Sequence, residues 1–411
     1  MKLVRPADRP WTTPSTYWPG LQAATADLDP PYGVISLDAL AHNAFDMLDR
    51  AKGTPIRVAS KSVRVRGIID AVLALPGYAG VLAYTLPEAL WLATPSADGA
   101  AIDDVVVAYP TADRAALRRL AASPELAARV TIMVDSVAQL DFVDAVVAPA
   151  QREAIRVCLE IDASWNSKLF GHLGVRRSPV HSVAEARALA EVIVARPGFT
   201  LVGIMGYEAQ IAGLVNQPAG NPLRGAAVKW VQKQSAAELA ERRGLAVASV
   251  REIADLEFVN GGGTGSIEST IADTSVTELT AGSGLFGGHL FDRYRAFRPA
   301  PAASFVLSVV RTPAPGIATV EGGGWIASGP VGPDRSPLPV WPQGLAYQPR
   351  EQAGEVQTPL AGADLRVGDR VVMRHTKSGE PAERLAEYVL VADGAVQGTM
   401  ATYRGEGRTF T

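Results

Sequence analysis

Lys61 is the residue of this sequence whose chemistry is easiest to specify, because it brings a single amine to the end of an apolar stretch, residues 56–60. A lysine amine in such a place can form a Schiff base with a carbonyl compound. A lysine that ends a strand is more often an exposed charge, so Lys61 alone does not decide between the two interpretations. Other segments of the sequence must decide between these interpretations.

A second segment, residues 257–266, runs from an apolar strand into glycines and small hydroxyl residues. Glycines allow positive φ and let backbone N–H groups approach an anion closely. We therefore predict that Gly262, Gly263, Thr264 and Gly265 hold a phosphate group, with a plain flexible turn as the alternative. This segment does not match the usual nucleotide-binding loops, because the motif Gly-x-x-x-x-Gly-Lys-Ser/Thr is absent and the glycines lie late in the chain.

Composition limits the class of protein. The chain has 411 residues, 47% of them hydrophobic, and a formal net charge of −3, so we expect a large core, two domains and no nucleic-acid partner. The single cysteine, Cys158, excludes an intramolecular disulfide and is expected to be a small buried apolar residue. The first residues, 1–6, begin no apolar run of signal-peptide length, and no stretch approaches the roughly 18 residues of a membrane span. We therefore predict a cytoplasmic protein with no membrane partner.

The elements that would position Lys61 and the glycines are short apolar segments separated by amphipathic ones. Strands that are apolar almost throughout are typical of parallel sheets buried on both faces. Eight of them, with room for a helix between each pair, predict an α/β fold, a (β/α)8 TIM-type barrel, with a doubly wound open sheet as the alternative. The predicted strands are residues 56–61, 80–84, 104–109, 130–135, 156–162, 201–207, 257–261 and 278–282.

In such a barrel the chemistry lies at the carboxyl ends of the strands, and phosphate groups are commonly bound after the seventh and eighth. Lys61 ends the first predicted strand and Tyr207 the sixth. The glycine-rich loop follows the seventh strand, and Gly282 with Ser283 follows the eighth. The order of these residues therefore predicts one site at one end of the barrel.

The sequence changes character after about residue 295, where helical periodicity gives way to strands and Pro/Gly-rich connections. We predict strands over residues 304–311, 317–321 and 369–374. The expected organisation is an N-terminal extension, residues 1–30, that joins the β domain, a barrel over residues 31–295, and a mostly β C-terminal domain over residues 296–411.

These segments together resemble the fold-type III pyridoxal-phosphate enzymes, the alanine racemase-like barrels, and among them the branch of D-threonine aldolase and D-serine dehydratase. Residues 31–40 with Asn43 are similar to the first segment of that family, and residues 57–62 to its cofactor-lysine strand. Residues 261–265 and 278–283 are similar to its loops on the phosphate side. The resemblance covers most of the chain.

The resemblance implies that Lys61 holds pyridoxal phosphate as a Schiff base, that the partner is a small-molecule amino-acid substrate and that the protein is a homodimer. One departure concerns Gly171-His172-Leu173-Gly174-Val175, where the family has an arginine near the phenolic oxygen of the cofactor and this chain has His172. A histidine that packs near a turn is the alternative, and Arg176 is a second source of charge. The predicted cofactor-binding residues are Lys61, His172, Tyr207, Gly262, Gly263, Thr264, Gly265, Gly282 and Ser283.

A second departure concerns metal. The aldolase and dehydratase branch holds a divalent ion with a His-x-Asp or His-x-Cys pair, whereas this chain reads His375-Thr376-Lys377. A protonated lysine is a poor ligand, so the pair is broken, and Glu380 or Glu383 would have to substitute. We predict that His375 is a catalytic acid or base and leave a divalent metal undecided.

Three functions follow from this resemblance. The first is a lyase, an aldolase or dehydratase acting on a D-3-hydroxy amino acid, which His375 favours. The second is an amino-acid racemase, whose second base in this fold is a tyrosine of the partner subunit; Tyr347, Tyr388 and Tyr403 are available. The third is a non-catalytic pyridoxal-phosphate-binding protein, which the presence of a second domain disfavours.

Overall fold

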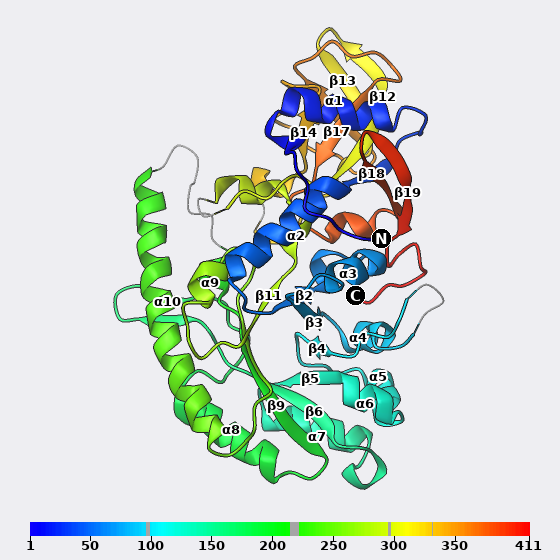
Figure 1. Ribbon diagram of the computed structural model, residues 1–411. Coiled ribbons are helices and arrows are strands. Elements are labelled where there is room, and N and C mark those ends of the chain that lie inside the picture. The colour runs from blue at the N-terminus through cyan, green and yellow to red at the C-terminus, as the bar shows by residue number, and fades with distance from the viewer. Residues whose placement is uncertain (96–98, 214–221, 295–296, 331) are drawn as a thin grey trace. The chain divides into compact units, whose positions relative to one another are not determined.

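The computed structural model describes residues 1–95, 99–213, 222–294, 297–330 and 332–411 (Figure 1). They form two compact units that interleave along the chain. The barrel unit comprises Met47–Lys61, Leu73–Gly282 and Phe410–Thr411. The β unit comprises Met1–Asp46, Ser62–Val72 and Ser283–Thr409. The consecutive segments 31–295 and 296–411 expected from sequence therefore differ from the compact units.

The barrel unit is built on eight parallel strands that close in the order β10-β11-β2-β3-β4-β5-β6-β9. Closure confirms the predicted barrel, and the doubly wound open sheet is wrong because β11 pairs with β2. Each predicted strand overlaps an observed one. The bounds are β2 Ile56–Ala59, β3 Tyr78–Ala83, β4 Val105–Val107, β5 Val130–Val134, β6 Ile155–Glu160, β9 Phe199–Gly206, β10 Phe258–Gly261 and β11 Glu278–Ala281.

The side chains of these strands explain the closure. All residues of β4, β5, β10 and β11 are buried, as expected for strands covered on both faces. A cluster that includes Leu82, Met133, Val202 and Phe258 packs together, and Cys158 belongs to it. The predicted burial of Cys158 is thereby confirmed.

Helices connect the barrel strands, and several begin at a side chain that accepts a hydrogen bond from the first turn. Thr85, Asp113, Ser123 and Ser182 are such N-caps, and Ser182 forms a full capping box with Glu185. The bounds are α4 Leu86–Leu92, α5 Arg114–Ala121, α6 Pro124–Arg129, α7 Val137–Val146, α8 Val183–Ala195, α9 Ala209–Ala212, α10 Pro222–Arg251 and α11 Ile267–Thr270, with 3-10 turns η2 Ser60–Ser62 and η3 Pro149–Gln151.

A two-stranded hairpin interrupts the connection between β6 and α8. It consists of β7, Trp165–Ser167, and β8, Gly171–Leu173, which pair antiparallel so that Asn166 faces His172. The sequence analysis did not predict this hairpin, because strands of three residues with mixed polarity carry no periodic signal.

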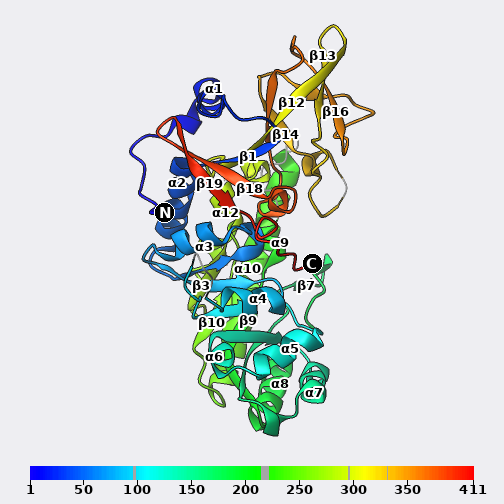
Figure 2. The same cartoon turned by 90° about the vertical axis from the view of Figure 1, so that its right-hand side faces the viewer.

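The β unit contains a nine-stranded sheet, which confirms a mostly β part after the barrel strands. Figure 2 shows β12, β13 and β16, which pair antiparallel. Early residues join this sheet, because β1 pairs with β12 and runs parallel to β18. The strands are β1 Tyr32–Ser36, β12 Ala303–Ala314, β13 Ile317–Glu321, β14 Leu338–Trp341, β15 Ala346–Tyr347, β16 Gln357–Ala361, β17 Arg370–Arg374, β18 Glu387–Ala392 and β19 Ala395–Ala401.

The first residues of the chain contribute to the apolar core of the β unit. Tyr17, Trp18 and Leu21 of α1, Pro14–Ala24, are buried in a cluster with Val34 and Val306. The remaining elements are η1 Pro10–Thr12, α2 Leu37–Ala51, α3 Arg66–Leu73, α12 Ser283–Phe286, η4 His289–Arg293, η5 Pro333–Arg335 and η6 Glu380–Glu383. Among the described residues, no helix combines the length and the apolar character that a membrane span requires.

Candidate functional site

Lys61 lies in the 3-10 turn η2, immediately after β2. The turn is fixed by Ser60, whose buried hydroxyl donates to the carbonyl of Leu82 at 3.1 Å. Lys61 itself is exposed, and its Nζ lies 3.5 Å from the hydroxyl of Tyr109, the second residue after β4. The structure therefore brings an amine and a phenol together at the carboxyl ends of two barrel strands.

Arg177 and Tyr207 join this pair. The guanidinium carbon of Arg177 lies 5.7 Å from the ring centroid of Tyr109 and 5.5 Å from that of Tyr207, distances at which a cation is attracted to an aromatic face. Burial raises the pKa of Tyr207, and the positive charge of Arg177 opposes that rise. We call Lys61, Tyr109, Arg177 and Tyr207 the amine–phenol cluster.

Two residues of this cluster, Lys61 and Tyr207, are among the cofactor-binding residues predicted from sequence, whereas Tyr109 and Arg177 are not. Arg176 is the second source of charge named from sequence, but the structure places Arg177 over the two tyrosine rings. Adjacent arginines in a loop have no periodic pattern that separates them, so only the fold distinguishes the two.

Carboxyl groups lie at the ends of β5 and β6. Glu160 is 5% exposed, and its pKa is raised to about 7, first by burial and then by the nearby charge of Asp135, while Arg177 opposes the rise. Burial also raises the pKa of Asp135, which accepts a hydrogen bond from Gln139 at 2.7 Å. Glu160 can therefore take up or release a proton near neutral pH.

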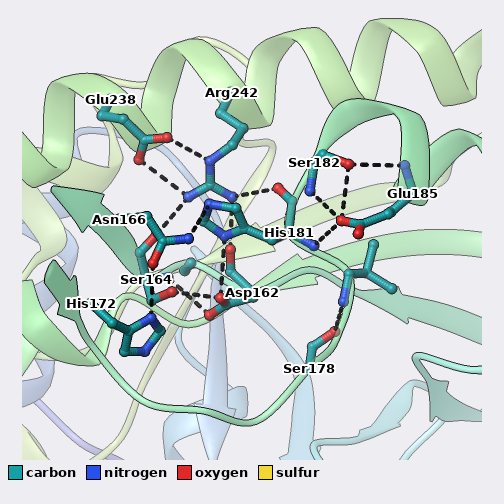
Figure 3. Close-up of polar contacts among 12 residues, drawn as sticks. Asp162, Ser164, Asn166, His172, Ser178, His181, Ser182, Glu185, Glu238 and Arg242 are labelled. Atoms are coloured by element: carbon teal, nitrogen blue, oxygen red, sulfur yellow. Dashed lines mark hydrogen bonds and ion pairs between the residues drawn. The ribbon is translucent and has the colours of Figure 1, made fainter. Parts of the chain in front are cut away.

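His172 lies on β8 at the end of a chain of polar contacts (Figure 3). Its Nδ1 is 3.0 Å from Asn166 Oδ1, and Asn166 Nδ2 is 3.1 Å from His181 Nε2. His181 Nδ1 in turn is 3.2 Å from a carboxylate oxygen of Asp162. The Nε2 atom of His172 is buried and has no hydrogen-bond partner among the described residues.

The glycine-rich loop follows β10 as predicted and is braced from within the barrel unit. Gly262 has φ +90° and donates its N–H to Glu208 Oε2 at 3.0 Å, and Gly263 donates to Ser266 Oγ at 3.1 Å. The carbonyl of Thr264 accepts from Arg50 at 2.8 Å. The positive φ thus falls on Gly262, where a side chain would be strained.

Crowding also explains some of the glycines. A Cβ on Gly263 would lie 3.1 Å from the Cβ of Ala212 and 3.3 Å from the ring of Tyr207. A Cβ on Gly282 would lie 2.5 Å from the carbonyl oxygen of Ala59, so close approach of β11 to β2 requires this glycine. Their phosphate-binding role stays a prediction.

Ser283 and His375 belong to the β unit. The carbonyl of Ser283 accepts from the hydroxyl of Ser378 at 2.6 Å. His375 is 3% exposed, with Nδ1 3.1 Å from the carbonyl oxygen of Ala303 and Nε2 3.3 Å from Ser378 Oγ. Burial lowers the pKa of His375 to about 3, so its imidazole is neutral at neutral pH. A neutral imidazole can accept a proton or bind a metal, but it has no acidic proton to give.

The two carboxylates named as substitute metal ligands are engaged elsewhere. Glu380 accepts from the N–H and the hydroxyl of Ser328, and Glu383 pairs with Arg64 at 2.6 Å. In the part of the chain that the structure describes, no three histidine, cysteine, aspartate or glutamate residues come together in a way that could hold a metal ion.

Comparison with known proteins gives a consistent group of relatives. Residues 35–289 match the family model of the alanine racemase N-terminal domain. The chain is 29% identical over 273 residues to 3-hydroxy-D-aspartate aldolase from Paracoccus denitrificans. This stretch covers 65% of the chain and 62% of the aldolase, less than two thirds of the length of that relative.

Two solved structures share the fold over nearly the whole chain. D-threonine aldolase from Filomicrobium marinum superposes with a TM-score of 0.72 at 23% identity and covers 92% of this chain and 96% of the aldolase. D-threo-3-hydroxyaspartate dehydratase from Delftia sp. HT23 superposes with a TM-score of 0.68 at 21% identity, covering 91% and 97%.

Proposed function

Because the chain belongs to the alanine racemase N-terminal domain family of fold-type III, whose members depend on pyridoxal phosphate, we propose that it is a pyridoxal-phosphate-dependent lyase. Its substrate would be a D-3-hydroxy amino acid, and its reaction an aldol cleavage or a dehydration. The observation that carries the proposal is the placement of the Lys61 amine beside Tyr109 at the carboxyl ends of barrel strands. The names of the aldolases and the dehydratase among the relatives support the substrate class.

The residues of the barrel unit suit this cofactor. Lys61 offers the amine for covalent attachment, and the rings of Tyr109 and Tyr207 with the guanidinium of Arg177 suit a flat, anionic aromatic group. The Nε2 of His172, which has no hydrogen-bond partner among the described residues, is a buried polar atom that a bound group would satisfy. The loop at Gly262 to Gly265 remains our proposal for the phosphate.

Pyridoxal phosphate, when bound, withdraws electrons from a bond at Cα of an amino acid. The protein must then decide which bond breaks: for aldol cleavage a group must accept the proton of the substrate hydroxyl, whereas for dehydration a group must donate a proton to the departing hydroxyl. His375 remains our proposal for the acceptor in the aldol cleavage; burial lowers its pKa to about 3, so its neutral imidazole is a weak base as the residues stand here. In the barrel unit, Glu160 is a second group that can take up or release a proton near neutral pH, because burial raises its pKa to about 7.

The racemase is the second candidate, and the structure does not favour it. A racemase of this kind would need an accessible tyrosine hydroxyl from the β unit of a partner subunit. Tyr388 and Tyr403 are each 1% exposed, and Tyr347 donates its hydroxyl to the carbonyl of Pro337. Burial raises the pKa of Tyr347 and of Tyr388, which weakens either as a base near neutral pH. The homodimer itself stays a prediction.

Substitution of Lys61 tests the cofactor assignment. Purified protein should show a visible absorption band with pyridoxal phosphate, and borohydride reduction should attach the cofactor to the peptide that contains Lys61. Lys61→Ala should lose both signals, whereas Lys52→Ala, which removes another exposed lysine, should keep them. A band that survives in Lys61→Ala, or a colourless wild type after addition of the cofactor, would overturn the assignment.

Product analysis separates the three functions. The protein is incubated with D- and L-threonine and with D- and L-serine, and glycine, oxo acid and enantiomer are assayed separately. We expect glycine or oxo acid from the D-substrates. Interconversion of enantiomers as the only activity would support the racemase, and cofactor binding without turnover would support the non-catalytic protein.

The divalent metal that the aldolase and dehydratase branch would imply is tested by a chelator. The structure shows His375 engaged with Ala303 and Ser378, and Glu380 engaged with Ser328. Loss of activity on chelation, restored by a divalent ion, would show that a metal takes part and that these side chains rearrange to bind it. Unchanged activity would show a metal-independent reaction.

A further inference from the structure

We propose that Asp162, His181 and Asn166 form a hydrogen-bond relay that keeps the proton of neutral His172 on Nδ1 and leaves Nε2 as a hydrogen-bond acceptor. Where the family has an arginine that donates to the phenolic oxygen of the cofactor, this chain would present an acceptor for the phenolic hydroxyl. That second step rests on the proposed function, whereas the relay itself is a property of the protein without cofactor.

In the proposed relay, the direction of each hydrogen bond is set by Asp162, the carboxylate at one end. Asp162 also accepts from the N–H of Ser164, at 3.0 Å, and from its hydroxyl. An ionised carboxylate has no proton to donate, so His181 must carry a proton on Nδ1, 3.2 Å away. In the proposed relay His181 carries this proton alone, so its Nε2 keeps a lone pair that accepts from the amide Nδ2 of Asn166 at 3.1 Å.

The same logic reaches His172. With its Nδ2 directed at His181, Asn166 directs Oδ1 at His172 Nδ1, 3.0 Å away. An amide oxygen only accepts, so the proton of neutral His172 must be on Nδ1. Nε2 keeps a lone pair, is buried and has no partner among the described residues. Asp162, His181 and Asn166 thus act in series to set the tautomer of His172.

The backbone around the relay is held by charged side chains. Arg242 of α10 donates to the carbonyl oxygens of Asp162, His181 and Ser164 at 2.7, 2.9 and 2.8 Å (Figure 3). Glu238 holds Arg242 in turn at 2.6 Å. One guanidinium therefore fixes both ends of the Asp162–His181 hydrogen bond, so that the ring of His181 keeps its position relative to the carboxylate.

Two further contacts fix the other side. Glu185 at the start of α8 accepts from the N–H of His181 at 3.0 Å. On the hairpin, Asn166 and His172 are direct cross-strand partners, and Gly174 packs so closely that a Cβ there would lie 2.6 Å from the Cβ of Ser164. The relay is thus built from the loop after β6, the hairpin and the residue before the N-cap of α8, and Arg242 anchors the first and the last of these.

The chemical consequence distinguishes His172 from arginine. Arginine carries donors only and keeps its charge, whereas His172 in this relay offers an acceptor that can also take up a proton. Asn166, His181 and Asp162 are therefore positioning residues, and His172 is the residue that touches the bound group.

The tautomer of His172 can be read without cofactor or substrate. Long-range proton–nitrogen NMR distinguishes the protonated from the unprotonated nitrogen of a neutral imidazole, and the chain has five histidines to assign. His172→Gln identifies the signals of His172. We expect Nδ1 protonated and Nε2 unprotonated, which is the tautomer that free imidazole side chains disfavour. If the amide of Asn166 faced the other way, His181 would carry two protons and His172 would be protonated on Nε2, a result that would overturn the proposal.

A matched pair of variants at Asn166 tests the relay against a merely structural role. Asn166→Asp keeps an oxygen acceptor for His172 Nδ1, so His172 should keep its tautomer. Asn166→Ala removes that acceptor, so His172 should shift toward the Nε2-protonated form. Both substitutions lie on the hairpin rather than in the barrel core, and circular dichroism controls for folding. A tautomer of His172 that is the same in Asn166→Ala as in the wild type would overturn the proposal.

A double-mutant cycle relates the relay to the cofactor. When His172 is present, Asn166→Ala should weaken pyridoxal-phosphate binding about tenfold, a loss typical of one hydrogen bond. In the His172→Arg background, where an arginine needs no relay, the same substitution should leave the affinity unchanged. Equal losses in both backgrounds would contradict the relay. A wild type that does not bind the cofactor at all, while the NMR result holds, would overturn the proposed function and not the relay.

Discussion

Two histidines selected from the sequence lie in opposite environments. His172 on the hairpin of the barrel unit has one nitrogen bound to Asn166 and a second, buried nitrogen without a partner among the described residues. His375 in the β unit is 3% exposed and has a neighbour at each nitrogen, Ala303 and Ser378. Both residues are histidines with the same intrinsic chemistry, so the difference between them comes from their surroundings.

The comparison shows how burial selects a chemical role. An imidazole enclosed with its partners loses its charge, as the pKa of about 3 for His375 indicates, because removal from water penalises the charged form. An imidazole with one unused nitrogen keeps a position for a ligand. Variants at the two positions should therefore affect different properties, and four predictions test this from the largest effect to the smallest.

The first prediction concerns catalysis by His375. If His375 accepts the hydroxyl proton of the substrate, His375→Ala should lower the rate of β-bond cleavage by about 10²–10⁴-fold, the usual range for a general acid or base. Exchange of the Cα proton with solvent should survive, because it needs only Lys61 and the cofactor. Both rates are measured on the same substrate, by product formation and by deuterium uptake. Full β-bond cleavage in His375→Ala would leave His375 as a structural histidine of the β unit.

The second prediction compares stability. His375→Ala removes a ring that packs edge-on against Phe286, at 6.5 Å between centroids, and leaves the carbonyl of Ala303 without its donor. We expect the free energy of unfolding to fall by about 3 kcal/mol, as for other large buried side chains. His172→Ala should cost less than about 1 kcal/mol, because the hairpin is partly exposed. Thermal unfolding of both variants is the measurement, and similar losses would contradict the contrast in burial.

The barrel shows what the sequence could predict. The eight apolar segments predicted from composition all overlap observed strands, since a strand buried on both faces needs apolar residues throughout. The position of Lys61 after β2 and of the glycine-rich loop after β10 followed from the same count. Local sequence carries this information because each strand is recognisable without its partners.

Long-range pairing and side-chain direction were beyond the sequence. β1 joins β12 and β18, which lie far along the chain, and no pattern within β1 identifies such partners. The relay joins Asp162, Asn166 and His181 across a hairpin whose strands are too short for a periodic signal. The contact of Arg177 with two tyrosine rings depends on the fold alone. The pairing of Asn166 with His172 across the hairpin became visible only in the structure.

The third prediction concerns the pH dependence of stability in the two units. The raised pKa of Glu160, about 7 against an ordinary 4.5, means that the folded barrel unit holds this proton more tightly than the unfolded chain does. Its stability should therefore fall as pH rises from about 4.5 to 7 and level off above. The pKa of His375, lowered from 6.5 to about 3, has the opposite consequence. The β unit should lose stability as pH falls below about 6.5.

Glu160→Gln isolates the barrel contribution, because glutamine keeps the shape and does not titrate. Relative to the wild type, the variant should gain on the order of 2 kcal/mol between pH 4.5 and 7, and no more above pH 7. Unfolding is followed by denaturant titration at several pH values. A difference between variant and wild type that is independent of pH would show that Glu160 titrates in its ordinary range.

The fourth prediction concerns two glycines, one in each region. Gly263→Val should weaken pyridoxal-phosphate binding by about tenfold, about 1.4 kcal/mol, because its side chain would press on Ala212 and on the ring of Tyr207. The effect is modest since Gly263 is not the residue at positive φ; that residue is Gly262. Folding should change little, because the ring of Tyr207 can shift by the few tenths of an ångström required.

Gly288→Ala is the matched control in the β unit. Its Cβ would lie 3.2 Å from His375 Nε2 and too close to the carbonyl oxygen of Thr376, which is backbone and cannot turn aside. We therefore expect Gly288→Ala to lower the melting temperature more than it lowers cofactor affinity, and Gly263→Val to do the reverse. Cofactor titration and thermal unfolding of both variants complete the test. If Gly263→Val left the affinity unaltered, the loop after β10 would be a plain connection, and the phosphate would have to be sought elsewhere.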